Sequence, residues 1–90
     1  MGQGLRKQLT ASQIRAARAL INWTAADLSR ESAVSLRTIR RAELANERTS
    51  MTTANDQSVR RALEGAGVEF IDENGGGPGV RLRARLKNKV

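Results

Sequence analysis

Residues 23–43 read W-T-A-A-D-L-S-R-E-S-A-V-S-L-R-T-I-R-R-A-E, and this stretch decides the fold because it encodes two short helices joined by a tight turn. Thr24 is a good N-cap for the first helix, since its hydroxyl can accept a hydrogen bond from a free N–H of the first turn. Asp27 stands three residues later, where its carboxylate can reach back and complete a capping box. Ser35 gives the same N-cap signal for a second helix, predicted over residues 36–45.

The apolar residues of this stretch predict which side of the second helix faces inward. Val34 and Ile39 stand at the spacing of a hydrophobic staple, and Ala42 follows on the same side. The outer side is then rich in arginine. A helix-turn-helix whose second helix carries outward-facing arginines has the shape that enters the major groove of DNA. The residues left for the outer face are Ser35, Leu36, Arg37, Arg40 and Arg41.

The same residues resemble the helix-turn-helix of the phage repressor/Cro-like family, often called XRE, and the resemblance covers residues 10–64. Two positions depart from the family's pattern. Ala33 stands where the family usually has a glycine in the turn, which predicts a left-handed residue that carries a β-carbon. Ala25 stands where the family often has a glutamine that contacts DNA. The matching residues are Arg18, Leu28, Val34, Ser35, Thr38, Ile39 and Glu43.

The resemblance also implies an ion pair between Arg18 and Glu43. In the family, an arginine and a glutamate at these places tie the first helix to the end of the recognition helix, and the arginine also approaches the DNA backbone. The simpler alternative is two unrelated surface charges, and an exposed pair contributes about 0–1 kcal/mol at most. We expect the pair to form.

The rest of the chain extends the motif to a mainly α fold: a four-helix, repressor-like helix-turn-helix domain followed by a C-terminal β-hairpin. Thr10 and Gln13 predict a capping box for the first helix, and a fourth helix is predicted from Thr52 or Thr53 to a stop at Gly67. After Gly67 the apolar period changes from helical to two, which indicates two antiparallel strands. The predicted parts are a flexible arm (1–9), the helical domain (10–67), the hairpin (68–83) and a basic tail (84–90).

An isolated β-hairpin is marginal in water, so this one must either pack on the helices or pair with a second subunit. We expect pairing, in a homodimer built from the hairpin and the fourth helix. Residues 75–79 could be taken for a phosphate-binding loop, but a strand follows them instead of the helix N-terminus that such a loop needs. The predicted interface residues are Val68, Phe70, Val80 and Leu82.

Composition argues against several classes of function. The chain has no cysteine and no histidine, which removes disulfides, metal sites based on these residues and the commonest general base. Carboxylates and Ser/Lys pairs do not cluster in the sequence, so we expect no enzyme activity and no metal, cofactor or small-molecule ligand. No apolar run approaches the ~20 residues of a membrane span and no signal peptide is visible, so we expect a cytoplasmic protein.

Sixteen basic residues face nine acidic ones, and thirteen of the basic residues are arginine. Arginine can bind phosphate and guanine edges through two parallel hydrogen bonds, so this balance, together with the motif, favours nucleic acid. We expect a sequence-specific, homodimeric regulator of transcription, such as a repressor, that places residues 36–45 in the major groove of double-stranded DNA. Base contacts are expected from Ser35, Leu36, Arg37 and Arg41. Phosphate contacts are expected from Arg18, Thr24, Thr38, Arg40, Arg48 and Thr49.

Two other functions stay open at this point. Some helix-turn-helix proteins of this size act as antiactivators or antitoxins that grip a protein partner. A recombination directionality factor of the excisionase kind is the other alternative. Those factors are winged, whereas here a whole helix separates the recognition helix from the hairpin, which counts against it.

Overall fold

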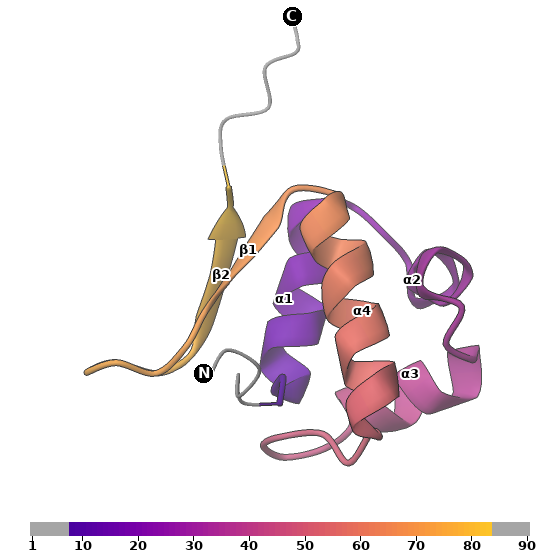
Figure 1. Ribbon diagram of the computed structural model, residues 1–90, viewed down its shortest axis with the longest axis horizontal. Coiled ribbons are helices and arrows are strands. Elements are labelled where there is room, and N and C mark those ends of the chain that lie inside the picture. The colour runs from indigo at the N-terminus through magenta and orange to yellow at the C-terminus, as the bar shows by residue number, and fades with distance from the viewer. Residues whose placement is uncertain (1–7, 84–90) are drawn as a thin grey trace, which may run out of the picture.

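Four helices precede a two-stranded antiparallel sheet in this chain (Figure 1). The computed structural model describes residues 8–83, so residues 1–7 of the predicted arm and the predicted basic tail, 84–90, lie outside the described residues. The predicted mainly α architecture with a hairpin after the helices is confirmed at this level. The elements are α1 (Ala11–Leu20), α2 (Ala25–Ser32), α3 (Leu36–Glu43), α4 (Thr53–Gly65), β1 (Val68–Ile71) and β2 (Gly79–Leu82).

The hairpin and the α2–α3 pair lie at opposite sides of the molecule in Figure 1. α2 contacts α3 and α4, α3 also contacts α1, and the hairpin lies against α1 and α4. The α2–α3 pair is therefore positioned mainly by the other two helices, against which the hairpin also lies. Within residues 8–83, no helix is both long and apolar enough to cross a membrane.

Each helix begins after the hydroxyl residue that the sequence indicates. The four cap hydroxyls each accept a hydrogen bond from the backbone N–H three residues further on, which satisfies a donor that the helix itself leaves free. Capping boxes are complete at the starts of α1 and α2, as predicted. α3 ends before residue 45 because the N–H groups of Leu44 and Ala45 bond to carbonyls only three residues back, at 3.2 Å each. The caps are Thr10, Thr24, Ser35 and Thr52.

One hydrophobic core joins all four helices and β1. Trp23 and Val80 pack against it while partly exposed. Burial of this apolar surface is the main stabilising contribution to a domain of this size. The buried members are Leu9, Ile14, Ala17, Leu28, Val34, Ile39, Ala42, Met51, Val59, Leu63, Val68 and Phe70.

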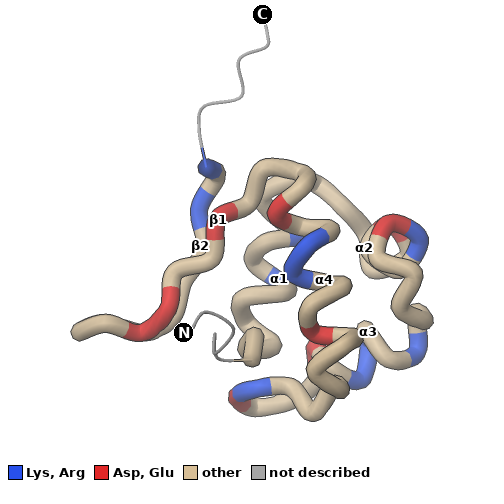
Figure 2. Tube along the Cα trace, in the orientation of Figure 1, with Lys and Arg blue, Asp and Glu red and all other residues tan. Residues whose placement is uncertain are grey.

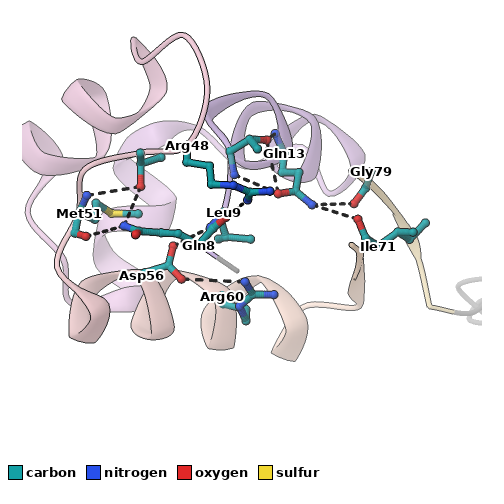
Figure 3. A network of polar contacts seen from close by, with 11 residues as sticks. Gln8, Leu9, Gln13, Arg48, Met51, Asp56, Arg60, Ile71 and Gly79 are labelled. Atoms are coloured by element: carbon teal, nitrogen blue, oxygen red, sulfur yellow. Dashed lines mark hydrogen bonds and ion pairs between the residues drawn. The ribbon is translucent and has the colours of Figure 1, made fainter. Parts of the chain in front are cut away.

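Residues 8 and 9, the end of the predicted flexible arm, belong to the folded unit, so the predicted boundary is wrong there. Leu9 is 1% exposed, and its N–H donates to the buried carboxylate of Asp56 at 3.0 Å. The amide of Gln8 donates to the carbonyl of Met51 (Figure 3). These bonds fasten the segment that precedes α1 to the start of α4.

The hairpin packs its apolar face on the helices of its own chain. β1 and β2 pair with Phe70 opposite Val80 and Val68 opposite Leu82. Val68 is 0% and Phe70 8% exposed, Val80 lies against the core, and Leu82 is half-buried. Val68 and Phe70 therefore leave little apolar surface for the predicted dimer interface, and Val80 and Leu82 keep only part of theirs.

Gln13 connects α1 to the two strand ends that flank the hairpin loop (Figure 3). Its side-chain oxygen accepts from the N–H of Thr10 at 3.0 Å, which completes the capping box of α1. Its side-chain nitrogen donates to the carbonyls of Gly79 at 3.1 Å and Ile71 at 3.4 Å. The oxygen of this buried side-chain amide thus caps α1, while its nitrogen holds the ends of both strands.

Gln13→Glu separates these two roles. Glutamate suits the capping box as well as glutamine does, but it cannot donate to the strand carbonyls and places a negative charge beside them. We expect a loss of about 1–3 kcal/mol in the free energy of unfolding, measured by urea denaturation, with faster hydrogen exchange in β1 and β2. The exposed Gln57 on α4 provides a matched control, Gln57→Glu, with little expected effect. Equal stability of the two variants would contradict the role assigned to Gln13.

Candidate nucleic-acid interface

The turn between α2 and α3 is made by Ala33 in a left-handed conformation, with φ 61° and ψ 20°. This confirms the conformation predicted from the missing glycine, and it carries a steric cost for a residue with a β-carbon. Two serines of α2 hold the turn in place. The hydroxyl of Ser29 donates to the carbonyl of Val34 at 2.6 Å, and the N–H of Val34 donates to the hydroxyl oxygen of Ser32 at 3.2 Å. These bonds offset the strain and set the angle between the helices.

The predicted ion pair between Arg18 and Glu43 is present and ties α1 to the end of α3. Nε and one terminal nitrogen of Arg18 each donate to a different carboxylate oxygen of Glu43 at 2.7 Å, and the other terminal nitrogen donates to the carbonyl of Trp23 at 2.9 Å. The hydrogen bond to Glu43 is the main cause that raises the pKa of Arg18 above its ordinary value. Arg15 adds a second tie, because its guanidinium donates to the backbone carbonyl of Glu43.

The outer face of α3 carries three exposed arginines, Arg37, Arg40 and Arg41. Within the described part of the chain, none of them has an ion pair or hydrogen-bond partner, whereas most of the other arginines do. Ile39 and Ala42 on the opposite face are buried, at 1% and 3% exposed. α3 therefore presents a cationic surface to solvent while its apolar side faces the core.

This cationic surface lies far from the acidic part of the hairpin. Figure 2 shows the basic positions of α3 on one side of the molecule and the acidic positions of the hairpin loop on the other. Asp72 and Glu73 are both exposed in that loop. No carboxylate of the loop is thus placed to neutralise the arginines of α3.

The smaller residues predicted to contact DNA lie around the two helix starts. Ser35 is exposed, and Leu36 and Thr38 beside it are half-buried. The hydroxyl of Ser35 donates to that of Thr38 at 2.9 Å and also caps α3. Thr24 is exposed at the start of α2, where its hydroxyl oxygen accepts from the N–H of Asp27 at 3.0 Å. All four residues keep surface that a ligand could reach, with Leu36 offering less of it than predicted.

Three of the predicted phosphate contacts are instead engaged within the fold. Arg18 uses Nε and both terminal nitrogens on Glu43 and Trp23, as described above. Arg48 donates to the carbonyl of Gln8 (Figure 3) and pairs with Glu73 at 3.4 Å. Thr49 is 5% exposed, and its hydroxyl oxygen accepts from the N–H of Met51 at 3.4 Å. These side chains are largely committed to bonds within the fold, which leaves them little freedom to contact a phosphate.

Several residues of the site were not predicted from the sequence. Ser29, Ser32 and Arg15 act through hydrogen bonds to the backbone at positions five, two and 28 residues away, for which residue type alone gives little signal. Leu44 is different. It is 82% exposed and stands seven residues after Arg37, a helical spacing that the sequence already contains.

Within residues 8–83, no group of three or more His, Cys, Asp or Glu residues could hold a metal ion. A comparison with models of protein families finds no family that matches this chain. A comparison with curated proteins likewise finds no match. The assignment of a function therefore rests on the residues of this chain and their arrangement.

Removal of one partner of the Arg18–Glu43 pair should destabilise the protein, because the other charge stays about four-fifths or more buried, at 21% and 11% exposed. We expect Arg18→Met and Glu43→Gln each to cost about 1.5–3 kcal/mol, with a favourable coupling energy in the double-mutant cycle. The exposed pair Glu69–Arg81 is the matched control and should show a coupling of about 1 kcal/mol or less. Equal coupling in both pairs would contradict a special role for Arg18 and Glu43.

The cap of α2 should weaken in acid. The pKa of Asp27 lies below its ordinary value of 3.8, first because the backbone N–H of Thr24 donates to its carboxylate and then because Arg30 does. Since the folded state has the lower pKa, this contribution is complete above pH 3.8 and is lost as the pH falls through the folded value. Between about pH 5 and about pH 2, Asp27→Asn should therefore lose less stability than the unchanged protein. Parallel stability curves for the two proteins would refute this.

Proposed function

We propose that this protein is a sequence-specific regulator of transcription that binds double-stranded DNA. In this proposal α2, the turn at Ala33 and α3 form a helix-turn-helix of the phage repressor/Cro-like kind, and α3 lies in the major groove. The observation that carries the proposal is the set of three exposed arginines on α3, Arg37, Arg40 and Arg41, without partners in the described chain.

Electrostatics favours an anionic ligand at this face. Three guanidinium groups on one eight-residue helix repel one another, and the repulsion is relieved when an anion binds between them. Phosphates supply that charge along both edges of a DNA groove. Guanidinium groups also fit O6 and N7 of guanine through two hydrogen bonds, in a rigid planar geometry that lysine lacks.

The dimensions of α3 suit the major groove. An α-helix with its side chains is about 10–12 Å in diameter, and the major groove is about 12 Å wide. Arg37 and Arg41 are four residues apart and share one side of the helix, so both can face base edges. Arg40 and Thr38 flank that side, where phosphates are the nearer partners. Ser35 lies at the N-terminus of α3, and the N-terminal residues of a recognition helix are the ones that usually contact the bases.

A homodimer remains part of the proposal, with two copies of α3 about 34 Å apart on two half-sites. The apolar face of the hairpin is largely used inside the monomer, so the subunits would meet mainly through another surface. The mass of the protein–DNA complex on one selected duplex measures the number of bound copies directly.

The test begins with selection of bound duplexes from a random pool, followed by affinity measurements on the selected site. We expect Arg41→Ala to cost about 1–3 kcal/mol on that site and to relax the preference at one base pair. Arg61 on α4 is also exposed and has no partner in the described residues, so Arg61→Ala is the matched control. It should change affinity slightly and equally on all sequences.

Two outcomes would count against the proposal. Equal losses for Arg41→Ala and Arg61→Ala would mean that net charge alone drives binding. No binding of any duplex at low salt, together with capture of one protein partner that depends on Arg37 and Arg41, would favour the protein-binding antitoxin or antiactivator alternative. A steep salt dependence with a site preference would support DNA binding.

A further inference from the structure

Leu44 is the most exposed large apolar residue in the described part of the chain. Its side chain is 82% exposed, and the next such residue, Leu20 on α1, is 38% exposed. Leu44 follows the last residue of α3 and has φ −92° and ψ −7°, so the backbone is still close to helical at this position. Leucine brings no capping group to a helix end, and at this exposure it adds little to the core.

The position of Leu44 on the helix surface is the same as that of the arginines. Seven residues make almost two turns, so Leu44 lies only about 20° around the axis from Arg37. It is also three residues after Arg41. Ile39 and Ala42, which are buried, point to the other side. The outer face of α3 is therefore a ridge of three arginines continued by one leucine.

We propose that Leu44 contacts the 5-methyl group of a thymine in the major groove and so contributes to the choice of DNA site. This inference rests on the proposed function. The thymine methyl is the apolar group that a normal base pair presents in the major groove, and an aliphatic side chain can sense it without a hydrogen bond. Arginine cannot supply this contact well, because its guanidinium must stay solvated or paired.

The geometry also gives the position of that thymine. Leu44 lies about 10 Å further along the helix axis than Arg37, and successive base pairs are about 3.4 Å apart. The contacted thymine should therefore lie within about three base pairs of the base that Arg37 contacts, because a helix inclined to the DNA axis spans fewer base pairs than one parallel to it. Leu36, the apolar residue among the predicted base contacts, is half-buried and offers less apolar surface.

The experiment compares thymine with uracil, which differ by the methyl group alone. Each thymine of the selected site is replaced singly by deoxyuridine, and affinity is measured for the unchanged protein and for Leu44→Ala. One replacement should weaken binding of the unchanged protein about threefold to tenfold and have no effect on binding of Leu44→Ala. Leu44→Met, which keeps an apolar side chain, should retain most of the sensitivity.

Several controls distinguish this inference from the proposed function. Leu44→Ala should melt at the same temperature as the unchanged protein, and its affinity should keep the same salt dependence, because no charge is removed. Leu20→Ala should leave DNA affinity unchanged. If binding to the selected site needs Arg41, but every thymine-to-deoxyuridine replacement affects the unchanged protein and Leu44→Ala equally, the thymine contact is overturned and the proposed function stands. An equal loss on all sequences for Leu44→Ala would overturn it too, whereas absence of any DNA binding would remove both.

Discussion

The position of α3 depends on the ion pair between Arg18 and Glu43. An eight-residue helix is too short to be stable alone in water, so its place in the molecule must come from tertiary contacts. At its N-terminus, α3 is fixed by the turn at Ala33. At its C-terminus, Arg18 of α1 binds the carboxylate of Glu43, and Arg15 of α1 binds the backbone carbonyl of the same residue. With both ends fixed, the outer face of α3 has a defined direction.

Two groups among the arginines of this chain differ in a way that composition cannot show. One group holds the fold: Arg18 and Arg48 bond to backbone carbonyls and carboxylates from distant parts of the sequence. The buried Arg60 lies between Asp56 and the ring of Phe70, whose centroid is 5.4 Å from its guanidinium carbon. The other group, on α3, makes no such contact within residues 8–83. A count of thirteen arginines therefore overstates the surface available to an anion.

Local features of the fold could be predicted from the sequence, and non-local ones could not. The caps at Thr10 and Thr24 and the left-handed Ala33 depend on residues within a few positions of one another, so short patterns contain the information. The period-two pattern likewise predicted the strands. It could not say what their apolar face covers, since burial inside a monomer and burial in a dimer require the same residue types. The burial of Thr49 and the bond from Arg48 to Gln8, 40 residues away, have no local signal either.

The uneven placement of charge has a consequence for how the molecule would approach a polyanion. The hairpin loop holds two carboxylates, Asp72 and Glu73, and no basic residue, on the side away from the three arginines of α3. In the field of a duplex, such an object experiences a torque as well as an attraction. It would rotate during diffusion until α3 faces the phosphates and the hairpin loop points away from them, so that a larger share of collisions would begin in a productive orientation.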